Sequence, residues 1–299
     1  MRTSNRRWSG VLIALCAMFV LLAACGEDEP AVTPGGGDGG DGGDEQEFNL
    51  VSDGRLIVGS DIPYPPFEFE EGGNLTGFDV ELVSEIASRI GLEHDPNDDW
   101  ISTNFNTIFQ QLQGGTNFDI IVAAVTAYAP EGSPAAETVA DREKFVDFTV
   151  PYYTSLQSLT VNTSQTPDIE SVEDLPDGAR VGVQRGTTGA FYAEETLTNA
   201  ELADFAKSPP MYQQLLAGQI VAVFNDLPTS LVEIEGKEGL EVVEQIDTGE
   251  EYGIGVAKDN TALKDAMDAA LEEMFEDGTY AQIFQKYFPD QELPGYASE

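Results

Sequence analysis

Few side chains in this sequence are suited to covalent or metal chemistry. His94 is the only histidine, and the two cysteines, Cys16 and Cys25, both precede residue 26. A Ser-His-Asp triad or a histidine-rich metal site is therefore disfavoured, and the rest of the chain offers no thiol for catalysis or disulfides. His94 lies in a polar stretch, residues 93–99, so we expect it on an exposed loop. We expect neither a metal nor a cofactor.

The remaining charged groups are strongly unbalanced. The chain has 54 acidic and 14 basic residues among 299, for a formal net charge of −40. A nucleic-acid partner is disfavoured, because phosphate binding needs clustered lysine and arginine. The acidic excess is typical of a solvated surface suited to high ionic strength, and it also favours attraction of cationic solutes.

The N-terminus has the organisation of a secretory signal peptide, predicted at residues 1–24. Three arginines within the first seven residues precede an apolar run at 11–24, and small residues come directly before Cys25. This pattern resembles the bacterial lipobox, in which the cysteine takes a diacylglycerol and becomes the mature N-terminus. A helix over the apolar run would be about 21 Å long, too short for a ~30 Å hydrocarbon core. We therefore expect an extracytoplasmic protein, lipid-anchored to the cell membrane; an uncleaved anchor and simple secretion are the alternatives.

Residues 25–49 form the predicted linker between this anchor and the folded part. Residues 26–47 contain eight glycines and eight acidic residues, with no lysine or arginine. Such a composition cannot bury enough apolar surface to fold, so we expect a flexible, acidic, lipidated tether. The length that remains suits one large or two modest domains.

Beyond residue 50, strand and helix patterns alternate. Short apolar runs predict strands at residues 56–59, 118–125, 156–161, 180–184, 220–224, 241–246 and 252–258. Helical spacing predicts helices at residues 78–90, 108–112, 189–197, 263–274 and 280–287, with another after Ser208 that has proline in its first turn. This alternation predicts an α/β fold with mostly parallel sheets.

Six segments of the chain form an ordered set, at residues 56–68, 77–80, 141–153, 181–188, 215–226 and 277–280. In this order they resemble the polar amino-acid branch of the extracellular solute-binding proteins that feed ABC importers. Each segment is weakly specific alone, and their shared order over about residues 50–290 carries the identification. The resemblance implies a two-lobe, periplasmic-binding-protein-like clamp with two hinge strands and a ligand in the cleft.

The resemblance also implies a discontinuous first lobe. Lobe 1 would comprise residues 50–154 and 251–299, and lobe 2 residues 155–250. The hinges would lie near residues 153–156 and 249–252.

The resemblance assigns some residues to the backbone of a bound amino acid. Arg142 matches the arginine that grips the carboxylate with two hydrogen bonds. Thr187 and Thr188 follow Gly186 at the start of a helix, where backbone N–H groups would bind the same carboxylate. Asp226 ends a strand and matches the aspartate that pairs with the ammonium group. The structural alternatives are a helix-surface arginine and an aspartate that caps a helix.

Five further residues would complete the site. Asp61 would face the ligand side chain, and Tyr64 and Phe105 would form apolar walls around its stem, although Phe105 also suits an ordinary core position. An ionised aspartate only accepts hydrogen bonds, so arginine and lysine rank first as ligands and glutamine next. Ala124 and Thr126 occupy the family's small-x-Thr turn.

The sequence departs from the family between that turn and Arg142. Family members have a short connection there, whereas residues 127–141 intervene in this chain. We expect an extra loop that covers the cleft or contacts a partner.

These observations together predict a monomeric, membrane-tethered binding protein that is not an enzyme. It would capture a polar or basic L-amino acid and deliver it to the membrane subunits of an ABC importer. The alternatives are a cyclohexadienyl dehydratase-like lyase on the same fold and an amino-acid sensor.

Overall fold

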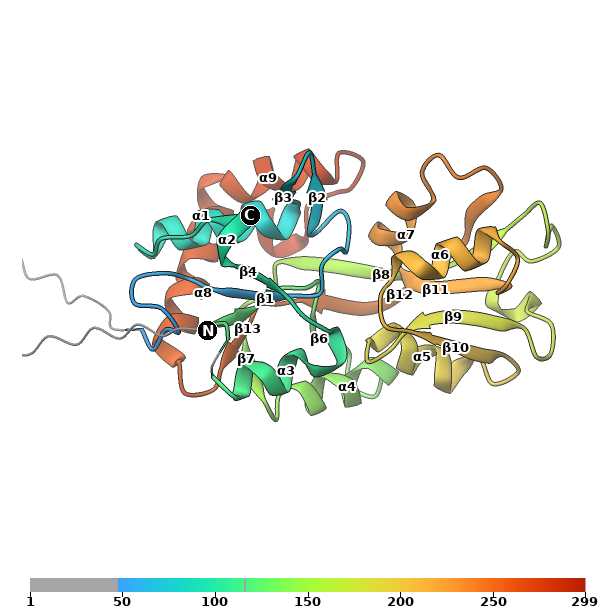
Figure 1. Ribbon diagram of the computed structural model, residues 1–299, viewed down its shortest axis with the longest axis horizontal. Helices are drawn as coiled ribbons and strands as arrows, with labels where there is room; N and C mark the ends of the chain where they lie inside the picture. Colours follow the sequence, from blue (N-terminus) through green and yellow to red (C-terminus); the bar gives the residue numbers. More distant parts are fainter. Residues whose placement is uncertain (1–47, 116, 299) are drawn as a thin grey trace, which may run out of the picture. The chain divides into compact units, whose positions relative to one another are not determined.

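The computed structural model describes residues 48–115 and 117–298. The predicted signal peptide, Cys25 and nearly all of the linker lie outside the described residues. Strands of the described part build a five-stranded sheet, a six-stranded sheet and the hairpin of β2 (Phe69–Glu71) and β3 (Asn74–Thr76) (Figure 1). The two large sheets, each with its own helices and buried core, form the lobes of the predicted α/β fold. No helix in these ranges is long and apolar enough to span a membrane.

The first sheet has the order β4-β1-β5-β13-β7. Its strands are β1 (Val58–Ser60), β4 (Trp100–Ser102), β5 (Ile120–Ile121), β7 (Val146–Phe148) and β13 (Gly255–Ala257). The helices of this lobe are α1 (Phe78–Arg89), α2 (Pro96–Asp99), α3 (Phe105–Gln113), α4 (Pro134–Arg142), α8 (Thr261–Asp277) and α9 (Thr279–Tyr287). Helices α1, α8 and α9 pack on one another, and α3 packs against β1, β5 and β13.

The second sheet has the order β10-β9-β11-β8-β12-β6. Its strands are β6 (Thr126–Tyr128), β8 (Tyr153–Asn162), β9 (Arg180–Gln184), β10 (Glu201–Phe205), β11 (Ala222–Asp226) and β12 (Leu240–Tyr252). Its helices are α5 (Thr188–Thr196), α6 (Pro209–Leu216) and α7 (Leu227–Ile234) (Figure 1). The boundaries given above for the lobes and hinges stay a prediction. The two predicted hinge segments overlap the paired strands β8 and β12.

The prediction of mostly parallel sheets is wrong. Strands β1, β4 and β5 run parallel, as do β9, β10 and β11, but β13 is antiparallel to β5 and β7. The long pair of β8 and β12 is also antiparallel. Strands β8 and β12 carry the chain between the lobes. A local apolar pattern does not show whether a strand runs parallel or antiparallel to its neighbour. Residues 118–125 are all buried, yet only Ile120–Ile121 pair as a strand, so that apolar run reflects burial rather than a long ladder.

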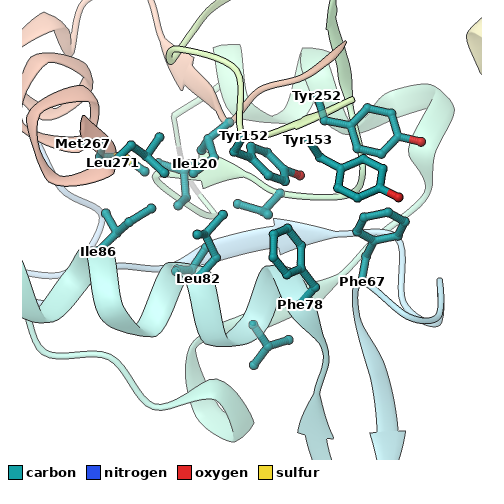
Figure 2. Close-up of a cluster of buried hydrophobic side chains, with 14 of the residues drawn as sticks. Phe67, Phe78, Leu82, Ile86, Ile120, Tyr152, Tyr153, Tyr252, Met267 and Leu271 are labelled. Atoms are coloured by element: carbon teal, nitrogen blue, oxygen red, sulfur yellow. The ribbon is translucent and has the colours of Figure 1, made fainter. Parts of the chain in front are cut away.

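An aromatic cluster fixes the ends of β8 and β12 against the first lobe. The rings of Tyr153 and Tyr252 stack with centroids 5.4 Å apart, and Phe67 meets them edge-on at 5.1 and 5.5 Å (Figure 2). Phe78 of α1 packs edge-on against Tyr153, with centroids 6.1 Å apart. Such pairs each contribute roughly 0.5–1.5 kcal/mol beyond the area they bury. The predicted hinge therefore begins at a rigid, packed support.

His94 is not the exposed loop residue that we predict from its polar neighbours. It is half-buried, its Nδ1 lies 2.8 Å from the Leu56 carbonyl oxygen, and its Nε2 accepts a hydrogen bond from Trp100 Nε1 at 2.9 Å. A neutral imidazole with its proton on Nδ1 satisfies both contacts. Burial also lowers the pKa of His94. The side chain therefore has a structural role beside β1 and β4.

Candidate functional site

A small cavity lies between residues of the two sheets. It is lined by Asp61, Tyr64, Glu68, Phe105, Ala123, Ala124, Thr126, Arg142, Gln184, Thr187, Thr188 and Asp226. All nine predicted ligand-binding residues are among them, and Glu68, Ala123 and Gln184 are lining residues that were not predicted. The cavity volume is about 20 Å³. That is room for one water and far below the roughly 300–1,000 Å³ of typical small-molecule sites.

Arg142 ends α4 and is only 4% exposed, which rules out the helix-surface alternative. Its guanidinium carbon lies 5.4 and 5.3 Å from the ring centroids of Phe105 and Phe109, and Nη1 donates to the Thr126 carbonyl at 2.7 Å. Its Nε finds no hydrogen-bond partner among the described residues. Burial lowers the pKa of Arg142 to about 10, so the group stays cationic at neutral pH. A buried cation with an unused N–H is suited to hold an anion.

The extra loop predicted at residues 127–141 is largely a helix. Ser133 precedes the first turn of α4, and Pro134 occupies the position where a missing N–H does no harm. Alanines and Glu137 favour the helix that follows. Helix α4 contacts α5 of the second lobe. The insertion therefore forms an element that carries Arg142 and spans the two lobes.

Asp226 ends β11 and precedes α7, but its carboxylate makes no capping bond to the described part of that helix. Its oxygens accept hydrogen bonds from Tyr64 Oη at 2.6 Å, Tyr252 Oη at 2.7 Å and Gln157 Nε2 at 2.6 Å. Burial, and then the charge of Glu250, raise the pKa of Asp226 to about 6, while the hydrogen bonds from the tyrosines and Gln157 oppose this rise. The helix-cap alternative therefore does not describe this side chain.

Thr187 and Thr188 begin α5, where the resemblance places carboxylate binding. The Thr187 hydroxyl accepts from Ala190 N at 3.0 Å and caps the helix. The Thr188 and Thr126 hydroxyls donate to the same oxygen of Glu250, at 2.5 and 2.7 Å. Glu250 is fully buried on β12 and was missed, because an acidic run is usually a solvated surface. Its position within the predicted hinge was the available signal.

Asp61 follows β1 and is 3% exposed. Its Oδ2 accepts from Gln184 Nε2 at 2.6 Å, and its Oδ1 accepts from the ammonium group of Lys207. Burial raises the pKa of Asp61, and both Lys207 and Gln184 oppose that rise. Lys207 was also missed, because it follows β10, a strand that we did not predict. Both oxygens of the Asp61 carboxylate therefore accept hydrogen bonds from residues of the second lobe.

Two residues show a constrained backbone beside the cavity. Ala124 has a φ of 47°, and among the described residues it is the only non-glycine with positive φ. Such a conformation costs about 1–3 kcal/mol and is common at functional sites. Ala124 N donates to Asp79 Oδ2 at 3.3 Å, which helps to hold it. Gly186 has a φ of 83°, and a Cβ there would meet Asn106 Cβ of α3 at 3.0 Å, so this turn requires glycine.

Comparison with known proteins supports the family resemblance. Residues 56–290 match the model of the bacterial extracellular solute-binding proteins, family 3. The L-cystine-binding protein TcyJ of Escherichia coli strain K12 is 28% identical over 248 residues, which cover 82% of this chain and 87% of that protein.

Two solved structures show an ancestral arginine-binding protein, one bound to arginine and one to glutamine. Each is 32% identical to this chain, with TM-scores of 0.69 and 0.70. The matches cover 79% and 80% of this chain and 98% and 100% of those chains. The ancestral amino acid-binding protein AncCDT-1, a precursor of cyclohexadienyl dehydratase, is 30% identical with a TM-score of 0.67. That match covers 79% of this chain and 95% of AncCDT-1.

Proposed function

Because this chain belongs to family 3 of the bacterial extracellular solute-binding proteins, we propose that it captures a polar or basic L-amino acid and delivers it to an ABC importer. The observation that carries this proposal is the joint presence of Arg142 and Asp226 in one cavity. A free amino acid carries a carboxylate and an ammonium group, and each must find an opposite charge when it leaves water. Arg142 and the N-terminus of α5 would hold the carboxylate, and Asp226 the ammonium group.

Ligand entry requires the two lobes to part. Side chains of both lobes close the 20 Å³ cavity, as in the hydrogen bond from Tyr64 to Asp226 and that from Gln184 to Asp61. A hinged clamp that opens at β8 and β12 and closes on its ligand meets this requirement. The register shift of β12 between Ile246 and Glu250 lies close to one predicted hinge and supports bending there.

A thermal-shift screen against the twenty amino acids, followed by calorimetry, tests the proposal. A ligand that binds only the folded protein raises its unfolding temperature. We expect saturable binding of at least one polar or basic amino acid. Binding of none of the twenty would contradict the proposal.

A lyase on the same fold is the second candidate, because this chain is similar to an ancestral amino acid-binding protein that is a precursor of cyclohexadienyl dehydratase. Incubation with arogenate or prephenate separates the two. We propose binding without catalysis, and formation of an aromatic product would favour the lyase.

We also place the protein outside the cytoplasm as a monomer, tethered through a lipid on Cys25. The apolar run before Cys25 and the acidic, glycine-rich segment after it support this placement. The tether would keep the binding protein close to the importer's membrane subunits. ATP hydrolysis would belong to separate subunits of the importer.

A further inference from the structure

The loop between β10 and α6 brings a lysine against the first lobe. Lys207 Nζ donates to the Asp61 carboxylate, to the Ile62 carbonyl at 3.0 Å and to the Thr103 carbonyl at 3.2 Å. All three acceptors follow β1 or β4, at the edge of the cavity where the ligand side chain is predicted. An ammonium group has three N–H donors, so Lys207 uses its full hydrogen-bonding capacity here.

This contact changes the charge that a ligand side chain would meet. Asp61 accepts from Gln184 through one oxygen and from Lys207 through the other. A ligand cation at Asp61 would bring a second positive charge beside Lys207, and one carboxylate cannot neutralise both. The two cations would meet at a carboxylate that water screens poorly, because the Asp61 side chain is only 4% exposed, although Lys207 itself is 30% exposed.

An unpartnered oxygen indicates what this end of the cavity can accept. Gln184 Oε1 is buried and finds no hydrogen-bond partner in the described part of the chain, and an amide oxygen can only accept. Burial, and then the neighbouring carboxyl of Asp79, raise the pKa of Glu68 well above its ordinary value, and the protonated Glu68 donates to Asp79. A ligand side chain that offers an N–H group without a positive charge therefore fits this end of the cavity.

We propose that Lys207 is a specificity-determining residue, which occupies Asp61 and directs the site to L-amino acids with a neutral, hydrogen-bonding side chain. Carboxamides, as in glutamine and asparagine, rank first because they offer N–H donors and carry no charge. This inference rests on the proposed amino-acid binding. It reverses the ranking from sequence, which placed arginine and lysine ahead of glutamine because Lys207 had not been placed at Asp61.

The test compares four ligands in four proteins by calorimetry. The ligands are glutamine, asparagine, arginine and lysine, and the proteins are the unmodified protein, Lys207→Met, Lys207→Arg and Lys237→Met. Lys237 is a matched control, because it is 31% exposed against 30% for Lys207 and lies near Glu233 of α7. Methionine keeps most of the stem and removes the charge, whereas arginine keeps the charge.

We expect the unmodified protein to bind a carboxamide at least about tenfold more tightly than arginine or lysine. The cationic side chain of a basic ligand would find no free anion in the site, because Asp61 is already paired with Lys207. In Lys207→Met the ratio should shift by about tenfold or more toward the basic ligands, whose cation takes the place of the lysine. Lys207→Arg and Lys237→Met should keep the original ratio. The ratio of the affinities for two ligands is measured on one preparation of each variant, so a partly misfolded fraction affects both affinities alike. Lys207→Gln replaces Lys207→Met if the latter does not fold.

Two results would overturn the inference while amino-acid binding stands. One is an unmodified protein that prefers arginine or lysine to both carboxamides. The other is a ratio that does not change when Lys207 loses its charge. Absence of binding to any of the twenty amino acids would instead remove the proposed function.

Discussion

The hydroxyl oxygens of Thr126 and Thr188 lie 3.1 Å apart, although Thr126 begins β6 and Thr188 begins α5. Both hydroxyls donate to one oxygen of the buried Glu250 carboxylate. Glu250 therefore holds a negative charge beside the residues that we propose for the ligand carboxylate. The two carboxylates would repel each other in a site with little water.

Replacement of Glu250 by glutamine should raise the affinity for an amino acid, by about five- to tenfold, because it removes this like charge. Calorimetry on the preferred ligand measures the change. Glu251→Gln is the control, since Glu251 is the next residue of β12 and does not line the cavity. An unchanged or lower affinity in Glu250→Gln, with Glu251→Gln as a reference, would contradict the proposed position of the ligand carboxylate.

The affinity should also fall in mild acid. The pKa of Asp226 is raised to about 6, and only the ionised carboxylate pairs with the ligand ammonium group. Below that pKa, affinity should drop by up to about tenfold per pH unit. Glu250→Gln should move the drop to lower pH, because the charge of Glu250 helps to raise the pKa of Asp226. Calorimetry between pH 5 and 8 would show a flat profile if Asp226 did not contact the ligand.

In contrast to the affinity, the free energy of unfolding of the protein without added ligand should rise in mild acid. The folded-state pKa values of Asp226 and Asp79 are raised to about 6 and about 7, above the ~3.9 of an unfolded aspartate. The native state therefore binds more protons than the unfolded state between about pH 4 and 7, so the free energy of unfolding rises as pH falls through that window. Thermal unfolding should show a higher midpoint at pH 5 than at pH 7.5. Asp226→Asn should reduce that rise, and an identical slope would contradict the assigned pKa.

Much of the cavity lining could be predicted from the sequence, because the family resemblance named the residues and several of them stand at the ends of strands or starts of helices. Asp61 and Asp226 follow apolar runs, and Thr188 opens a helix after a glycine, so each has a local signal. Glu250 and Lys207 have no such local signal, and only the predicted hinge points to Glu250. Glu250 lies in an acidic run, and Lys207 follows β10, whose residues are exposed or half-buried without regular alternation and so give a weak strand pattern. Their roles depend on contacts between lobes, which a local pattern does not encode.

The fold shows the same division between local and non-local information. The residues of α1 and α8 predict those helices because their apolar positions recur along one face. The antiparallel directions of β8, β12 and β13 were not predictable, since apolar runs look the same in either direction. The helix α4 was expected as a loop because Pro130, Gly132 and Pro134 dominate the start of the insertion, although Pro134 is in fact the first residue of the helix.

The lipid anchor can be tested without the structure. Cys25→Ser should release the protein from the membrane or leave it unprocessed, because serine has no thiol to take a diacylglycerol. Fractionation of cells and the mass of the mature protein measure both outcomes. Cys16→Ser is the matched control, since Cys16 lies within the predicted signal peptide and should not matter. A Cys25→Ser protein with ordinary processing and the original membrane association would contradict the lipoprotein assignment.

The proposed clamp on the ligand backbone gives the most direct test of the site. Arg142→Ala and Asp226→Ala should each weaken amino-acid binding by roughly 2–5 kcal/mol, because each leaves one buried ligand charge without its partner. Arg185→Ala is the control, since Arg185 is near Gly186 but is 53% exposed and points to Asp204 at 3.6 Å.

The guanidinium of Arg142 also packs on two phenylalanine rings, so Arg142→Ala can lower stability as well as affinity. Arg142→Lys separates these effects. Lysine keeps the positive charge but cannot form two parallel hydrogen bonds to a carboxylate, so affinity should still fall while thermal unfolding changes less. Calorimetry at a temperature where every variant is folded decides the result. Affinities of Arg142→Ala and Asp226→Ala that equal that of Arg185→Ala would remove both residues from the binding site.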